Sequence, residues 1–588
     1  MCLEVNEMRT KNLRLPFRLC LTVVALELLA GSVMIPQTAT AAGTWTKLNR
    51  GAPGPVNLML LLSDGTVMAQ NTGGNAWYRL TPNNGSYVDG TWTTRASMTS
   101  TRLYYSSAVL RDGRVLVAGA EYGTGWNTAE VYNPSSDSWS PAPVPAGLIN
   151  QNNTLGPQGR NQAGFTDSIC KILPNGNVLV APNYPTAPGG TLIYNPVANS
   201  WKAGTNWLGS QIEASWVKLP DDSILTVDNS STASERFIPA LNQWIADANL
   251  PVSLYDAIQE LGAGFLLPNG RVIFLGGTGK TAIYTPSGNT TPGSWVAGPV
   301  IPGGWGCSDS AAAMMDLNGR ILCAVGPSGV FAAPTSFYEY DYLDLTAGPN
   351  GSFTQVASPT GGFTDSNISP GATNTIIPYQ TIMLVLPDAS VLYSDSTTNL
   401  YAYLPTGFPR LTALPTISSI TANGDGSYHL IGAGLNGLSE GAAYGDDAQM
   451  DGNYPLVRIS DGSGNVIYLP TFNWSSTGVA TGTTPVSTEF FSFQNLVAGL
   501  PYSLVVVANG LASDPVTFYG PVWADFTSVN PFQTGLYNFP YHTLGQAITA
   551  VPATGAINIK TTGHTTETMT ITKAMTINAL GGPATIGQ

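Results

Sequence analysis

Seven residues share one spacing along the chain and carry side chains that could do chemistry. Each lies nine or ten residues before the glycine of a short turn, or before the residue in its place, and they are Tyr104, Asp167, Glu213, Glu260, Asp309, Tyr379 and Gln380. Four of them are acidic, although only 10% of the residues in the chain are charged. Four carboxylates around one opening would repel one another, which raises some of their pKa values or attracts a cation such as calcium. Two carboxylates about 5 to 10 Å apart would suit glycoside cleavage.

The same pattern also fits carboxylates that stay on solvated loops and never meet. An error of one residue in the register of a strand turns its side chains to the opposite face, so the spacing leaves both interpretations open. Both depend on the repeated turns and strands that carry these residues.

A turn-forming phrase recurs seven times and sets this spacing. The turns are Ser63–Gly65, Arg111–Gly113, Pro174–Gly176, Pro220–Asp222, Pro268–Gly270, Leu317–Gly319 and Pro387–Ala389. Asp-Gly and Asn-Gly pairs favour tight primed hairpin turns, because those turns need positive φ at their central residues. Each turn lies between two apolar runs, so each predicts a β-hairpin.

An aromatic residue recurs between these turns, at Trp45, Trp92, Trp139, Trp201, Trp244, Trp295 and Phe353. Successive aromatics are 43 to 62 residues apart. This spacing brackets the kelch repeat of roughly 50 residues, in which four antiparallel strands form one blade. The two series predict an all-β fold with a seven-bladed kelch-type propeller at residues 43–412. Trp45 precedes the first turn, so we expect the N-terminal strand to complete the last blade and close the ring.

The pattern changes after Pro415. Runs such as Thr416–Ile420, Leu456–Ile459 and Leu504–Val507 predict an immunoglobulin-like (E-set) β-sandwich at residues 413–519. Residues 521–588 contain further short β-rich runs and predict a partial segment of parallel β-helix. That segment is too short to bury a solenoid core alone, because stacked coils stabilise one another.

Residues 1–41 predict a secretory signal peptide. Basic residues precede an apolar run from Leu19 to Ile35, and Ala39–Ala41 offers a small-residue cleavage site. A retained membrane anchor is the alternative, although the run is at the short end for spanning a bilayer. We expect a secreted, periplasmic or cell-surface protein with no membrane span after signal removal. The formal charge of -13 argues against a nucleic-acid partner, which requires a basic face.

The segment Arg102–Ala108, followed by Asp112–Val115, resembles the second-blade segment of galactose oxidase and the related glyoxal oxidases. This secreted copper-radical family has a seven-bladed kelch propeller and a C-terminal immunoglobulin-like domain, an architecture that matches about residues 43–519. In the family, two tyrosines and two histidines bind copper. One tyrosine is cross-linked to a cysteine as the radical cofactor, and an aromatic residue stacks over the cross-link.

The resemblance places the radical tyrosine at Tyr104, the stacking aromatic at Tyr122 and the axial tyrosine at Tyr379. Gln380 stands where the family has its first histidine, and there is no cysteine near Val56–Asn57. The second histidine belongs near Phe472, but the three histidines are His429, which we expect on the first strand of the sandwich, His542 and His564. Copper(II) prefers imidazole nitrogens, so these departures predict a degenerate site without copper. We expect no cofactor, and calcium remains the alternative.

The function that this pattern favours is non-catalytic binding of a carbohydrate or an extracellular protein. The candidate ligand-binding residues are Tyr104, Tyr105, Tyr379, Gln380 and the four acidic residues. One alternative is a carboxylate-based glycan-processing enzyme that uses two of Asp167, Glu213, Glu260 and Asp309. The others are a degenerate copper-radical oxidase of alcohols or aldehydes, and a structural surface or matrix protein whose C-terminal segment promotes assembly.

Overall fold

The computed structural model describes residues 43–122, 124–125, 127–148, 165, 168–182, 190–211, 215–257, 261–308, 312–315, 318–365, 376–407, 410–423, 425–440, 453–492 and 496–587, with residues 312–315 described by their backbone alone. The signal peptide lies outside these ranges and remains a prediction. None of the helices in the described ranges combines the length and hydropathy that a membrane span requires.

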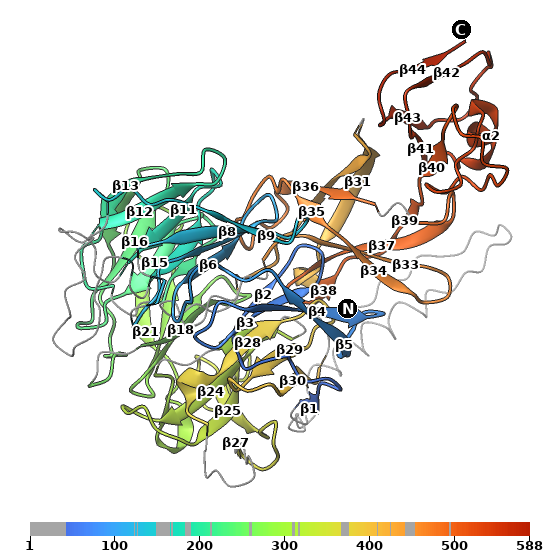
Figure 1. The fold of residues 1–588 in the computed structure, drawn as a ribbon. Helices are drawn as coiled ribbons and strands as arrows, with labels where there is room; N and C mark the ends of the chain where they lie inside the picture. The colour runs from blue at the N-terminus through green and yellow to red at the C-terminus, as the bar shows by residue number, and fades with distance from the viewer. Residues whose placement is uncertain are drawn as a thin grey trace, which may run out of the picture. The chain divides into compact units, whose positions relative to one another are not determined.

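Residues 44–404 form the seven antiparallel sheets of a β-propeller (Figure 1). Blade 1 contains β2 (Val56–Leu61), β3 (Val67–Asn71), β4 (Trp77–Asn83) and β5 (Ser86–Arg95). Blade 2 contains β6 (Ser106–Val109), β7 (Val115–Ala118), β8 (Ala129–Asn133) and β9 (Ser138–Pro141). Blade 3 contains β10 (Ile169–Ile172), β11 (Val178–Ala181), β12 (Gly190–Asn195) and β13 (Ser200–Asn206). Blade 4 contains β14 (Val217–Lys218), β15 (Ile224–Val227), β16 (Ser234–Ile238) and β17 (Gln243–Ala246). Blade 5 contains β18 (Leu261–Leu266), β19 (Val272–Gly276), β20 (Thr281–Thr285) and β21 (Ser294–Ala297).

Blades 6 and 7 complete the propeller. Blade 6 contains β22 (Trp305–Gly306), β23 (Ala312–Met315), β24 (Arg320–Pro327), β25 (Thr335–Asp341), β26 (Ser352–Val356) and β27 (Thr364–Asp365). Blade 7 contains β28 (Ile382–Val385), β29 (Val391–Ser394), β30 (Leu400–Leu404) and β1 (Thr44–Lys47). Three short 3-10 helices are η1 (Pro302–Gly304), η2 (Pro378–Gln380) and η3 (Leu411–Ala413). The structure confirms the all-β class.

The seven predicted turns join the two innermost strands of each blade, but they are not primed turns. Among the described residues of these phrases, positive φ occurs only at the third, for example Gly65 at 73° and Gly113 at 83°, while Asp222 and Ala389 adopt 64° and 70° without being glycine. In all seven, the Asp or Asn side chain accepts a hydrogen bond from the backbone N–H two residues later. This Asx-turn explains why Asp and Asn recur there even where glycine does not.

The ring closes through the first strand, as the position of Trp45 predicts. β1 pairs antiparallel with β30, with Trp45 opposite Tyr403. The Trp45 ring lies 4.7 Å from Tyr403 and 5.3 Å from Phe337 of blade 6, measured between ring centroids, and its Nε1 donates to the carbonyl of Ala357 at 2.6 Å. The N-terminal strand therefore joins blade 7 and also packs on blade 6.

The innermost strands of neighbouring blades contact one another around the ring. β2 contacts both β6 and β28, and β6 contacts β10. These strands are largely buried, as in β6 and β28, whose residues are all buried although β6 contains two serines. The loops that precede these strands consequently lie at one end of the ring, and the seven hairpin turns lie at the other end, here called the turn face.

The chain continues into a sandwich of two antiparallel sheets. One contains β31 (Thr416–Ala422), β32 (Ser427–Ala433), β36 (Pro485–Phe491) and β35 (Thr471–Phe472), and the other contains β34 (Val466–Leu469), β33 (Leu456–Ser460), β37 (Pro501–Ala508), β38 (Leu511–Ala512) and β39 (Val516–Tyr519). His429 lies on the second strand, β32, and not on the first as predicted, because β31 occupies that place. Its Nδ1 is 2.7 Å from Oε1 of Glu489.

The C-terminal segment contains parallel strands, as expected for an incomplete β-helix. They are β40 (Val522–Ala524), β41 (Ala556–Ile559) and β43 (Thr576–Ala579), with β42 (Gly563–Thr565) beside β44 (Ala584–Ile586). Helix α2 (Leu544–Ala550) was not predicted. It begins with a capping box in which Thr543 accepts from the backbone of Gln546, a signal that is visible in the sequence.

Replacing Trp45 with alanine should lower the free energy of unfolding by about 3 kcal/mol, at the low end for aromatic truncations because Trp45 is only partly buried. Amide exchange should rise in β1 and β30, whose pairing Trp45 supports. A matched Trp295→Ala variant should increase exchange in blade 5 instead. Unchanged exchange in β1 together with an unchanged melting temperature would contradict the closing role of Trp45.

Candidate functional site

Tyr104 and Tyr122 lie on two loops of blade 2 and face each other. Tyr104 precedes β6 and Tyr122 follows β7, and their ring centroids are 6.1 Å apart at an interplanar angle of 68°. Both residues have positive φ, 55° and 51°, which is unusual for bulky side chains. Such a conformation persists only where the surrounding structure imposes it. The pair is therefore positioned by its loops.

The buried Arg102 guanidinium connects these loops. Its Nη1 donates to the carbonyls of Gly119 at 2.6 Å and Thr128 at 3.0 Å, and its Nη2 donates to Oε1 of Glu130 at 2.9 Å. Arg102 is fully buried, and burial lowers its pKa. Burial alone would raise the pKa of Glu130, but hydrogen bonds from Thr99 and Arg102 hold it below its usual value. A buried charge is tolerated because it is paired in this way.

A second contact holds the two tyrosine loops together. The backbone N–H of Glu121 donates to the carbonyl of Leu103 at 2.8 Å, directly beside the two tyrosines. The N–H of Leu103 in turn donates to Oγ1 of Thr124 at 3.0 Å. Tyr105 points the other way and is buried in the propeller core, with 2% of its surface exposed. Of the two adjacent tyrosines, only Tyr104 is partly exposed.

Tyr379 and Gln380 belong to η2, immediately before β28. The Tyr379 ring packs edge-on against Phe331, with the centroids 5.7 Å apart. The side-chain oxygen of Gln380 accepts from the N–H of Ile377 at 3.4 Å, and its backbone carbonyl accepts from Oγ of Ser396 at 2.7 Å. Phe331, 43% exposed, was not singled out from the sequence.

Tyr104 and Tyr379 lie at the same end of the ring, because each precedes an innermost strand. Those strands, β6 and β28, both contact β2 of blade 1. The four acidic residues Asp167, Glu213, Glu260 and Asp309 lie outside the described residues. Their convergence, a calcium site and a catalytic carboxylate pair therefore remain predictions.

The donor set does not fit the copper site that the resemblance implies. The two phenols at Tyr104 and Tyr379 lack imidazole partners, and the amide oxygen of Gln380 already accepts a backbone hydrogen bond. The sequence has no cysteine near Val56–Asn57, where the resemblance would place it, and His429 contacts Glu489 in the sandwich. Across the described ranges, no three His, Cys, Asp or Glu side chains are arranged to hold a metal ion.

A buried carboxyl group next to η2 was missed by the sequence analysis. Asp395 follows β29, is 2% exposed, and accepts from the N–H of Thr397 at 3.2 Å and its hydroxyl at 2.5 Å. Burial raises the pKa of Asp395 to about 6; the Thr397 hydrogen bond opposes this shift and the nearby charge of Asp365 adds to it. Asp365 itself accepts a hydrogen bond from Tyr393 at 2.7 Å.

Two solved structures resemble the chain in fold. A fungal alcohol oxidase of the AA5 family, solved in complex with copper, is 12% identical with a TM-score of 0.45, over 82% of this chain and 99% of that one. A streptogramin B lyase is 12% identical with a TM-score of 0.40, over 62% of this chain and 98% of that one. No family model and no curated protein matches the sequence. These values assign neither a family nor an activity to the chain.

The raised pKa of Asp395 predicts a pH-dependent stability. Because its folded pKa of about 6 lies above the ordinary value of 3.8, the folded state binds more protons between these pH values. The contribution of Asp395 to stability therefore falls as pH rises from about 4 to about 6. The stability of an Asp395→Asn variant relative to the parent should rise over that range and then level off, as measured by urea unfolding.

Asp425→Asn provides the control with the opposite sign. Hydrogen bonds from Ser427 lower the pKa of Asp425, so its contribution to stability is lost only as pH falls through that lowered value. A stability difference for Asp395→Asn that stays constant from pH 4 to pH 7 would contradict the raised pKa.

Proposed function

We propose that the protein binds a carbohydrate at the tyrosine face, defined as Tyr104, Tyr122, Phe331 and Tyr379. The observation that carries the proposal is the Tyr104–Tyr122 pair, which two hydrogen-bonded loops hold in a backbone conformation that tyrosine rarely adopts. A positive φ at each tyrosine costs of order 1–3 kcal/mol. The hydrogen bonds of the buried Arg102 offset this cost, which supports a site that is already formed before a ligand binds.

The chemistry of the tyrosine face suits sugars. Aromatic rings pack against the apolar faces of pyranose rings, while phenol hydroxyls donate and accept hydrogen bonds with sugar hydroxyls. Because the scaffold fixes these rings, little side-chain entropy is lost on binding. The resemblance of Arg102–Ala108 to the sugar- and aldehyde-oxidising family supports a ligand site at this end of the ring, without its copper chemistry.

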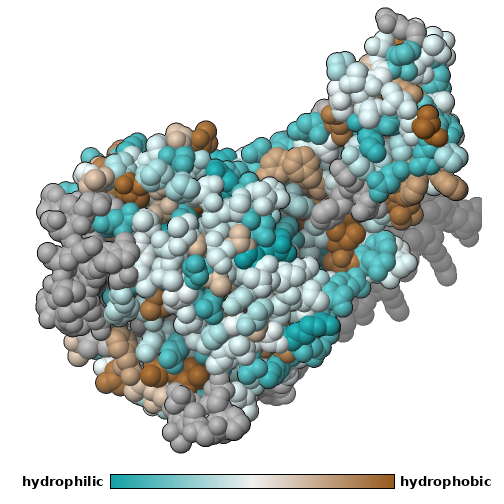
Figure 2. Space-filling model, viewed as in Figure 1, coloured by the Kyte–Doolittle hydropathy of each residue, from teal (hydrophilic) through white to brown (hydrophobic). Residues whose placement is uncertain are grey.

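A large obligate protein interface would require a broad apolar patch. On the side shown in Figure 2, hydrophobic residues form small separate patches among hydrophilic ones. Large protein interfaces of the obligate type are more apolar than that. A signal peptide at residues 1–41 would export the protein to where polysaccharides are exposed, so we propose a secreted or cell-surface binding protein.

A Tyr104→Ala/Tyr379→Ala double variant should show much weaker retardation than the parent in native gels that contain a soluble polysaccharide. A suitable panel is hydroxyethylcellulose, galactomannan, arabinoxylan and anionic polygalacturonate. The melting temperature should stay nearly unchanged, because both side chains are partly exposed and the Arg102 contacts remain.

Phe532→Ala serves as the control, since Phe532 is a 70% exposed aromatic residue outside the propeller. Its retardation should equal that of the parent. Undiminished retardation of the double variant on every polysaccharide that retards the parent would exclude the tyrosine face as the main site. Binding of an extracellular protein in place of every glycan would reject the ligand class.

A further inference from the structure

The turn face of blades 3 to 5 contains an open groove of about 700 Å³. Its polar lining includes Asn175, Asn177, Lys202, Asp221, Asn242 and Asn289. A second hollow of about 310 Å³ shares Asn175 and Asn177 with it and extends to Arg111, Asp112 and Asn195. We call the two together the asparagine groove. It lies at the opposite end of the blades from the tyrosine face, because it is built on the hairpin turns.

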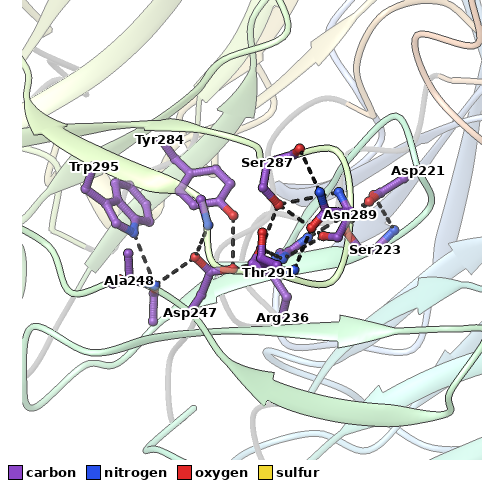
Figure 3. A network of polar contacts seen from close by, with 12 residues as sticks. Asp221, Ser223, Arg236, Asp247, Ala248, Tyr284, Ser287, Asn289, Thr291 and Trp295 are labelled. Atoms are coloured by element: carbon purple, nitrogen blue, oxygen red, sulfur yellow. Dashed lines mark hydrogen bonds and ion pairs between the residues drawn. The ribbon is translucent and has the colours of Figure 1, made fainter.

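A fully buried arginine lies beside the groove (Figure 3). The Nε of Arg236 pairs with Oδ2 of Asp247 at 2.5 Å, and its Nη2 donates to the carbonyls of Asn289 at 3.1 Å and Thr291 at 2.8 Å. Tyr284 donates to the same Asp247 oxygen at 3.0 Å. These contacts satisfy one side of the guanidinium. The remaining nitrogen, Nη1, is buried and has no hydrogen-bond partner in the structure.

That nitrogen is directed toward a groove residue. Nη1 of Arg236 is 3.9 Å from Oδ2 of Asp221, which is too long for a hydrogen bond. Oδ1 of Asp221 is already engaged by the N–H and hydroxyl of Ser223, at 3.0 and 2.6 Å, whereas the side chain as a whole is 39% exposed. Because Nη1 is buried, a ligand hydroxyl can reach only the exposed side of Asp221, where it can donate to Oδ2.

Other residues that line the groove can both donate and accept hydrogen bonds. Side-chain amides such as those of Asn177 and Asn242 both donate and accept, as sugar hydroxyls do. Lys202 and Arg111 face three carboxylates, Asp112, Asp221 and Asp222, so the groove has no excess of positive charge that would attract a polyanion. Pro174 and Pro239 add flat apolar surfaces of the kind on which a sugar ring can lie.

We propose that the asparagine groove is a second binding site, which takes an uncharged oligosaccharide segment. A hydroxyl of the ligand donates to Asp221, whose carboxylate faces the buried Arg236 on its other side, and the asparagine amides bind neighbouring hydroxyls. The site is separate from the tyrosine face and does not depend on ligand binding there.

The test uses the full chain with the tyrosine face already removed. In the Tyr104→Ala/Tyr379→Ala background, native gels containing hydroxyethylcellulose, galactomannan or arabinoxylan should still show weak retardation. Adding Asn177→Trp, which places bulk where the two hollows meet, should raise the dissociation constant at least about tenfold. Asn177→Ala should weaken binding less. Thr354→Trp, on the exposed outer strand of blade 6, is the matched control and should leave retardation unchanged.

Every result of this gel experiment either supports or refutes a second binding site in the asparagine groove. Complete loss of retardation in the tyrosine-face background would refute the groove while leaving the tyrosine face intact. Residual retardation that survives both Asn177→Trp and Asn177→Ala, in variants with unchanged melting temperatures, would also refute it. Retardation by polygalacturonate alone would refute the uncharged ligand class. Loss in the Asn177 variants but not in Thr354→Trp would support the proposal.

Discussion

The antiparallel pairing of β1 with β30 converts a linear series of sheets into a ring. Without it, blade 7 would expose an unpaired strand edge, and Trp45 would not bridge to Phe337 of blade 6. Closure fixes the order in which the innermost strands surround the centre. Tyr104 and Tyr379, far apart in the sequence, share one end of the molecule because β6 and β28 flank the same strand.

A small number of buried charges then position the loops on this frame. Glu130 of β8 accepts backbone hydrogen bonds from Thr99 and Ser100, in the connection that leads into blade 2. Glu235 of β16 does the same for Leu208 and Gly209, ahead of blade 4. In a chain where only 10% of residues are charged, these carboxylates give the N–H groups of the connecting segments a hydrogen-bond partner within the protein. The blades are thus joined by polar contacts as well as apolar packing.

Repeated features were predictable from the sequence, and features that occur once were not. The aromatic and turn series fixed the blade count and the role of Trp45, and the likeness of one segment to a known family identified Tyr122 as the neighbour of Tyr104. Sequence patterns do not reveal the positive φ of a tyrosine, the buried hydrogen bonds of Arg102 or the burial of Asp395. Each of these features depends on contacts with segments that are distant in the sequence. The turns were assigned the wrong geometry because Asp-Gly is compatible with more than one hairpin type.

We propose that the tyrosine face is a rigid binding surface and not a metal-radical centre. The most direct test is the copper content of the purified mature chain, measured by mass spectrometry after exposure to excess copper and extensive dialysis. Because imidazole and thiol partners are lacking around Tyr104 and Tyr379, we expect copper far below stoichiometric amounts. Stoichiometric copper that is lost on Tyr104→Phe substitution would contradict the claim and establish a metal site there.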